Sequence, residues 1–403
     1  MNFQDFDIPT LPRNHKQSGW LTVSTRADGG EWRLPLLYVT GRQPGATLVV
    51  TAAVHGDEYE GVEAIPSIYQ QVEPNSLRGT LVMLPVCNMP AYEAALRSSP
   101  VDGLNLARVF PGAAQGSITQ RIAYWITQQL LRHATFYIDL HSGGATYNIP
   151  TLIGYIHDAG ELGQRSLAGA RAFGAPILWG HPLPLAPGRT VSAATELGVP
   201  SLYSEAPGGG YARPDDVRCF TDGVLNVMKH LGMLEGSPQP RETTHHLFGD
   251  GNLDQVIAAD AAGYFRATVE LLEEVNAGQR IGTIRDPFGN LVQDVCADQD
   301  GIVIMLRRFH RVHVGDGLVH VTAQVEHKVA YPQTKVGCRN VKREISVVLS
   351  RFTFHRAGRA TYAYNVDLLA VRITWAVSQE SDGADPPAGQ GRCQGWWESG
   401  RPH

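Results

Sequence analysis

Residues 47–58 read TLVVTAAVHGDE, and this stretch decides the fold. Its first part, Thr47–Val54, is apolar and rich in β-branched side chains, which is typical of a strand buried on both faces. Apolar residues at helical spacing follow over Glu60–Gln71. A buried strand that turns into a helix is the unit of a sheet covered by helices. The charged residues of the turn are therefore expected at the end of a buried strand.

The same alternation of strand and helix patterns extends on both sides of this stretch. Short apolar runs predict further strands at Leu34–Val39, Thr80–Pro85, Thr135–Leu140, Thr151–Ile156, Pro176–Trp179 and Pro200–Ser204. Helical spacing recurs over Ser117–Arg132 and Asp216–Leu231. We therefore expect an α/β fold with a mainly parallel or mixed sheet flanked by helices.

The composition and residue pattern of the chain change after residue 234. This change predicts that the chain is divided into three parts. Polar, turn-rich residues over Glu235–Leu253 are typical of a linker, which includes His245 and His246 without a specific role. Short, glycine-punctuated strands then predict a small all-β barrel or sandwich at 250–323, after an α/β domain at 1–245. Residues 324–403 are polar, rich in Gly and Pro and without periodicity, so we expect a disordered tail.

Composition excludes several classes of protein. The 403 residues carry a net charge of −5, which gives no basis for binding nucleic acid. The longest apolar run, near Ala46–Val54, is far shorter than the roughly 20 residues that span a bilayer. The N-terminus has no signal-peptide pattern, and the 5 cysteines are scattered without a disulfide or zinc motif. These features predict a cytoplasmic protein with no membrane or nucleic-acid partner.

The strongest chemical signal is a set of metal-ligand residue types at two predicted strand ends. His55 and Glu58 lie three apart in the turn after the first strand, and His141 follows Thr135–Leu140. Ligands collect at the carboxyl ends of strands in open α/β sheets, and Zn²⁺ accepts two histidines and a carboxylate. We therefore expect these three to bind one zinc ion. Asp57 is either an acceptor for a ligand imidazole or a helix cap, and Asp139 is a second candidate acceptor.

A metal-activated water needs a base from another strand end. Glu205 follows the predicted strand Pro200–Ser204 and precedes three glycines, which suits a base near a ligand. The alternative for Glu205 is a helix-terminal carboxylate or a surface ion pair.

Arginine in an uncharged loop suggests an anion-binding site. Arg108 lies in such a loop and can hold a substrate carboxylate with its two-pronged guanidinium, unless it forms a structural pair with Asp102. Arg97 is the nearest second cation, and Asn88 is a candidate amide donor to the substrate.

Taken in order, HGDE, NLARVFPG, DLHSG and SEAPGGG resemble the succinylglutamate desuccinylase/aspartoacylase family, a branch of the zinc carboxypeptidase-like hydrolases. The resemblance covers about residues 20–322. It implies that His55, Glu58 and His141 are the zinc ligands, Glu205 the catalytic glutamate and Arg108 the carboxylate-binding arginine. Ala107 stands where many members have asparagine, which removes one amide from the substrate site. The chain also resembles a subgroup that contains deacetylases of N-acetyl diamino acids.

These observations predict a zinc amidohydrolase that removes an acyl group from the nitrogen of a small amino acid. One rival is a zinc carboxypeptidase that acts on peptide C-termini, and another is a non-catalytic metal- or ligand-binding protein of the same fold. The small β domain is expected to cap the site or to mediate a homo-oligomer. Residue types and spacing do not identify the acyl group or the amino acid.

Overall fold

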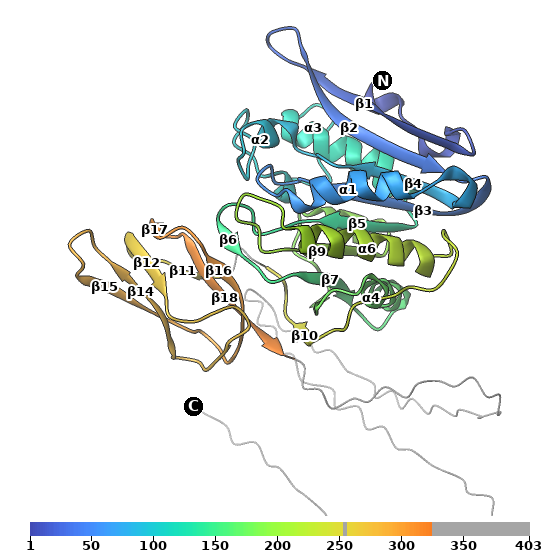
Figure 1. The fold of residues 1–403 in the computed structure, drawn as a ribbon. Coiled ribbons are helices and arrows are strands. Elements are labelled where there is room, and N and C mark those ends of the chain that lie inside the picture. Colours follow the sequence, from blue (N-terminus) through green and yellow to red (C-terminus); the bar gives the residue numbers. More distant parts are fainter. Residues whose placement is uncertain (253–255, 325–403) are drawn as a thin grey trace, which may run out of the picture. The chain divides into compact units, whose positions relative to one another are not determined.

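The computed structural model describes residues 1–252 and 256–324 (Figure 1). Its larger sheet begins with the strands β1 (His15–Thr25), β2 (Glu31–Thr40), β3 (Gln43–Ala52), β4 (Arg78–Leu84), β5 (Phe136–Leu140), β7 (Leu152–His157), β8 (Ile177–Pro182), β9 (Ser201–Glu205) and β10 (His245–Phe248). Their spatial order is β1-β2-β4-β3-β5-β9-β7-β8-β10. Strands β4, β3, β5 and β9 are parallel, whereas β7 is antiparallel to β9 and parallel to β8. The mixed sheet that the sequence predicts is confirmed.

Helices cover both faces of this sheet. One face carries α1 (Glu60–Gln71), α4 (Glu161–Phe173) and α6 (Pro214–His230), and the other carries α3 (Ile118–Trp125) and α5 (Thr190–Glu196). The short α2 (Met89–Glu93) follows β4. Side chains alternate between the two cores. Val50 and Ile138 pack with α1 and α6, while Val49 and Tyr137 pack with α3. This explains why the central strands read as continuous apolar runs.

The predicted helix at Ser117–Arg132 is correct in place but not regular. Its α-helical part ends at Trp125, and a π-helical turn over Ile126–Leu130 and a 3₁₀ turn over Leu131–His133 complete it. The sequence patterns did not predict β1, α4 or α5.

The small β region is confirmed as well. The sheet path continues from β10 through β18 (Gly317–Gln324), β16 (Gly301–Arg307) and β13 (Glu274–Val275), with β6 (Tyr147–Asn148) on β16 and β11 (Ile257–Ala258) on β18. A second sheet has the order β15 (Leu291–Cys296), β14 (Arg280–Arg285), β12 (Gly263–Ala267) and β17 (Arg311–Val312). A separate apolar core that includes Phe265, Ile284 and Val303 fills this region.

The predicted linker is wrong in one respect, because it contains β10. This strand pairs in parallel with β8 and antiparallel with β18, so the large sheet continues through it into the β region. His246, for which no specific role was predicted, forms a hydrogen bond: its Nε2 lies 2.7 Å from the hydroxyl of Tyr155. The predicted tail, residues 324–403, lies outside the described residues except for Gln324, which ends β18. Among the helices that are described, none is both long and apolar enough to cross a membrane.

Candidate active site

The three central strands bring the sequence motifs to one edge of the sheet. Ala52 of β3 is in register with Leu140 of β5, and Leu140 is in register with Ser204 of β9. The residues that follow these positions therefore leave the sheet side by side. The amide of His141 fixes this alignment by donating to the carbonyl of Ser204 at 3.1 Å.

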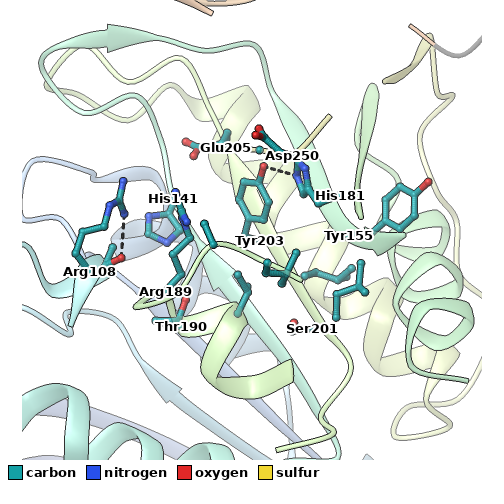
Figure 2. A pocket seen from close by; sticks show the side chains of 18 of the residues that line it. Arg108, His141, Tyr155, His181, Arg189, Thr190, Ser201, Tyr203, Glu205 and Asp250 are labelled. Atoms are coloured by element: carbon teal, nitrogen blue, oxygen red, sulfur yellow. Dashed lines mark hydrogen bonds between the residues drawn. The ribbon is translucent and has the colours of Figure 1, made fainter. Parts of the chain in front are cut away.

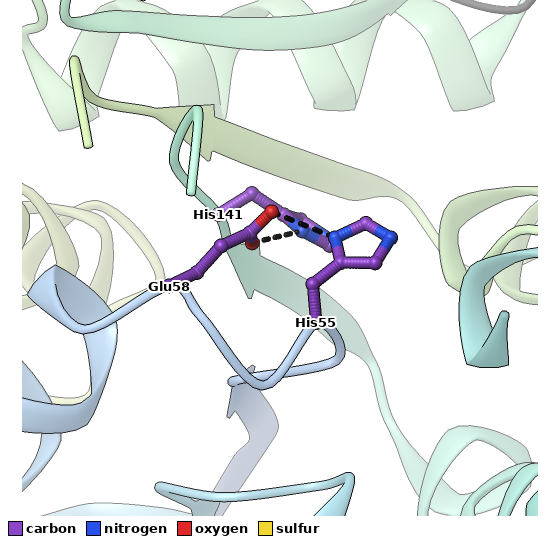
Figure 3. A group of neighbouring side chains, drawn as sticks. All are labelled: His55, Glu58 and His141. Atoms are coloured by element: carbon purple, nitrogen blue, oxygen red, sulfur yellow. Dashed lines mark hydrogen bonds and ion pairs between the residues drawn. The ribbon is translucent and has the colours of Figure 1, made fainter. Parts of the chain in front are cut away.

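His55, Glu58 and His141 converge there as predicted (Figure 3). Their ligand atoms all lie within 4.8 Å of one another. One carboxylate oxygen of Glu58 is 2.7 Å from Nδ1 of His55, and the other is 2.9 Å from Nδ1 of His141. The side chains are 5%, 3% and 11% exposed in that order. A buried two-histidine, one-carboxylate set of this kind is able to bind a metal ion.

The outer nitrogens of both imidazoles also have partners, which is the arrangement that metal-ligating histidines need. Nε2 of His141 lies 2.8 Å from Asp139, and Nε2 of His55 lies 3.2 Å from the amide oxygen of Asn105. Asp139 is fully buried and accepts further hydrogen bonds from the hydroxyls of Thr51 and Thr190. Both Nδ1 atoms are thereby directed at one point. The predicted role of Asp139 as an acceptor for the imidazole is confirmed.

Electrostatics within the triad favour a cation. Although burial opposes it, the two imidazoles lower the pKa of Glu58. Burial likewise disfavours a charged His141, yet Asp139 and Glu58 raise the pKa of that imidazole well above its usual value. Burial and then Arg97 lower the pKa of His55 to about 4. A metal ion bound by the three side chains replaces the protons that they otherwise share.

The turn that carries His55 is fixed by close backbone packing. A Cβ on Gly56 would lie 2.1 Å from the backbone of Ala91, so only glycine fits between His55 and Asp57. Asn88 holds the same turn: its side-chain amide donates to the carbonyl of Val54 and its oxygen caps α2 at the amide of Ala91. Asn88 is fully buried and does not line the cavity described below. The structure therefore gives it a scaffolding contact in place of the predicted contact with substrate.

Asp57 ties this turn to the loop after β5. Its Oδ2 accepts from the amide of Ala145 at 2.8 Å, and its carboxylate lies where a Cβ on Gly144 would fall. It neither contacts a ligand imidazole nor caps α1, whose N-cap residue Tyr59 makes no side-chain cap. Both interpretations offered for Asp57 are therefore wrong.

Glu205 stands at the end of β9, beside the triad. Its side chain is 7% exposed, and Oε2 has no hydrogen-bond partner among the described residues. Burial and the carboxylate of Glu58 raise the pKa of Glu205 to about 8. A cation held by the triad would favour its ionised form. We call His55, Glu58, His141 and Glu205 the strand-end cluster.

A cavity beside the strand-end cluster is lined by His55, His141, Glu205, Arg97 and Arg108. Figure 2 shows Arg108, His141 and Glu205 around it. Nη1 of Arg97 is 3.2 Å from Glu58. Arg108 ends a 3₁₀ turn, is half-buried and donates from Nη1 to the carbonyl of Ala107 at 2.9 Å. Asp102 instead accepts from the amide and hydroxyl of Thr119.

The sequence patterns did not single out several other residues of the cavity wall. Arg189, which precedes α5, donates to the side-chain oxygen of Asn252 at 2.8 Å. Asp250 lies in the loop after β10 and is exposed. We call Arg108, Arg189 and Asp250 the loop charges. No periodicity marks positions of this kind.

Tyr203 and His181 form a hydrogen-bonded pair in the same wall (Figure 2). Nδ1 of His181 is 2.8 Å from the carbonyl of Gly249, and Nε2 is 2.8 Å from the hydroxyl of Tyr203. Burial lowers the pKa of His181 to about 4, so the ring is neutral at pH 7 and carries its proton on Nδ1. The tyrosine hydroxyl must then donate to Nε2, which leaves its oxygen as an acceptor. The sequence alone could have indicated Tyr203 as a site residue, because it lies two residues before Glu205 and therefore on the same face of the strand.

Comparisons with known proteins agree with this geometry. Residues 44–231 match the succinylglutamate desuccinylase/aspartoacylase catalytic domain. The chain is 31% identical over 315 residues to N-alpha-acetyl-L-2,4-diaminobutyric acid deacetylase from Halomonas elongata, covering 77% of this chain and 92% of that relative. The chain therefore belongs to the succinylglutamate desuccinylase/aspartoacylase family.

Solved structures extend the similarity to most of the described residues. A succinylglutamate desuccinylase/aspartoacylase from Rhodobacter sphaeroides superposes with a TM-score of 0.72 at 31% identity, over 80% of this chain and 98% of that one. The product-bound ectoine utilization protein EutE (DoeB) from Ruegeria pomeroyi has a TM-score of 0.71 at 27% identity, over 78% and 98% of the two chains.

Proposed function

We propose that the protein is a zinc-dependent deacylase of small N-acyl amino acids. The observation that carries this proposal is the strand-end cluster, in which a His–Glu–His metal site lies beside a buried carboxylate with an unpartnered oxygen. Two neutral imidazoles and one carboxylate are a common protein ligand set of catalytic zinc, which keeps a further position open. Zn²⁺ in this site would polarise the amide carbonyl and lower the pKa of the attacking water.

Glu205 supplies the proton transfers. It accepts a proton from the water as the oxygen adds to the carbonyl carbon. It then donates that proton to the amide nitrogen as the C–N bond breaks, which releases a carboxylate and a free amine. A protein that only binds a metal or ligand would not need a buried carboxylate with an unpartnered oxygen beside the metal site. The carboxylate therefore favours an enzyme over a non-catalytic binding protein.

Arg108 is the candidate partner for the carboxylate of the amino acid. It lines the cavity, is half-buried and is bonded to the neighbouring carbonyl of Ala107, which limits the positions its fork can take. Arg97 lies against Glu58 and is the second candidate. A guanidinium holds a carboxylate in a defined orientation, so this contact would place the scissile amide over the metal.

The substrate that fits the rest of the cavity carries a second amino group. The carboxylate of Asp250 and the accepting oxygen of Tyr203 both line the wall, and both prefer a hydrogen-bond donor or a cation. Asp250 is held in place, since its Oδ1 accepts from the amide of Asn252 at 2.8 Å and Gly251 packs on His181. The relative from Halomonas elongata acts on an N-acetyl diamino acid. We therefore propose an N-acetyl diamino acid such as Nα-acetyl-2,4-diaminobutyrate as substrate.

The test is the release of free amine from a panel of compounds by the full-length, zinc-loaded protein. The panel pairs N-acetyl diamino acids with N-acetylaspartate, N-succinylglutamate and short peptides. The proposal expects turnover of acyl amino acids and highest kcat/KM for the diamino compounds. Cleavage of peptides alone would make the protein a carboxypeptidase instead.

A further inference from the structure

Each of the four residues that follow Glu205 forms a hydrogen bond with another part of the chain. This segment, Ala206–Gly209, directly follows Glu205 and contains no regular secondary structure. Three of its residues bond to the α/β region. The contacts are the amide of Gly143 to the carbonyl of Ala206 (2.9 Å), the amide of Gly208 to Glu60 (3.1 Å), and the amide of Gly209 to the carbonyl of Gly144 (2.7 Å).

The fourth residue, Pro207, is held from the β region. Nη2 of Arg308 donates to the carbonyl of Pro207 at 2.9 Å. The same guanidinium donates to the side-chain oxygen of Asn148 at 2.9 Å and to the carbonyl of Tyr147 at 3.0 Å. The backbone amide of Arg308 adds a bond to the carbonyl of Thr146 at 2.8 Å.

These acceptors belong to two different segments that follow active-site residues. Tyr147 and Asn148 form the short strand β6, in the segment that follows His141, whereas Pro207 lies in the loop that follows Glu205. One planar guanidinium, with its donors in a fixed fork, therefore sets the spacing between them. Arg308 directly follows β16, whose last residues pair with β6. Its side chain adds a contact from the β region to the segment after Glu205.

We propose that Arg308 is a positioning residue that aligns Glu205 with the metal triad. This inference rests on the proposed function, in which Glu205 is the base. Loss of the fork would let Pro207 shift, and a misplacement of about 1 Å can cost on the order of 10²-fold in rate. Metal binding would remain, because no triad residue contacts Arg308.

The experiment compares Arg308→Ala and Arg308→Lys with wild type in the full-length protein. We expect Arg308→Ala to lower kcat by at least about tenfold, with KM within about threefold and zinc content unchanged. Arg308→Lys should recover part of kcat, because one ammonium reaches fewer of the three acceptors. Hydrogen–deuterium exchange of the peptide over residues 206–210 should be faster in Arg308→Ala, a readout that needs no substrate.

The matched control is Arg307→Ala, the preceding arginine. Its side chain pairs with Asp316 at 2.8 Å inside the β region, so its loss should lower Tm while leaving kcat and exchange at 206–210 unchanged. Equal losses of kcat in both variants would overturn the positioning role and point to general destabilisation. Unchanged exchange in Arg308→Ala would overturn the contact itself. An inactive wild type would contradict the proposed function, and the exchange result would still decide whether Arg308 holds the loop.

Discussion

The strand-end cluster and the loop charges surround one cavity but are built differently. The residues of the cluster lie at the ends of buried strands in register or in the turn that follows, and their side chains are at most 11% exposed. The loop charges lie outside the strands and α-helices and are half-buried or exposed. Chemistry that needs atoms fixed to fractions of an ångström is thus placed on the rigid sheet. The residues proposed to recognise the substrate lie on loops, which tolerate sequence changes more easily.

The largest expected effect comes from removing a metal ligand. His141→Ala should abolish metal binding and lower kcat/KM by roughly 10³-fold or more, since a bound metal contributes several kcal/mol to the transition state and each 1.4 kcal/mol is tenfold. Metal analysis of the purified variant, beside an activity assay, measures both. Full metal content in this variant would show that the triad is not the site.

A smaller effect is expected at Arg108, and it should be specific to the substrate carboxylate. Wild type should prefer the free acid of an acyl amino acid over its amide by roughly 10²-fold in kcat/KM, about 2.7 kcal/mol. Arg108→Ala should lose this preference, and Arg108→Lys should retain only part of it. If both the wild type and Arg108→Ala discriminate equally, Arg108 is structural and another group such as Arg97 holds the carboxylate.

The smallest effect is expected at Asp250, because it is exposed and solvent screens its charge. Asp250→Asn should lower kcat/KM for Nα-acetyl-2,4-diaminobutyrate by roughly tenfold, about 1.4 kcal/mol, and leave N-acetylnorvaline unchanged. Asp158→Asn is the control, since Asp158 bonds the amide two residues on in the same way but lies outside the cavity wall. Equal losses for both substrates would remove Asp250 from substrate recognition.

The difference between the strand-end cluster and the loop charges also explains how much of the site could be predicted from the sequence. The central strands were predictable because a strand that is buried on both faces has a continuous apolar sequence. The strand-end cluster was predictable because its polar residues come where these apolar sequences end. Asp139 and Tyr203 follow the same logic, since each lies two residues before a cluster residue on its own strand.

Other features depend on partners distant in the sequence. Strand β10 is a short HHLF segment between polar residues, and it is a strand because β8 and β18 pair with it. Asn88 has the residue type of a substrate contact, yet its amide is used by the backbone of Val54 and Ala91. Arg189 and Asp250 lie in loops whose positions depend on tertiary contacts.

The central claim is that Glu205 acts as a base beside a zinc ion that it does not bind. The most direct measurement is a zinc titration of chelator-treated wild type and Glu205→Gln, following bound metal and amine release together. Both proteins should bind about one zinc per chain, and wild-type activity should rise with occupancy. The variant should stay roughly 10²–10⁴-fold lower in kcat at full occupancy. Near-normal turnover by zinc-loaded Glu205→Gln, or wild-type activity that does not depend on metal, would contradict the account.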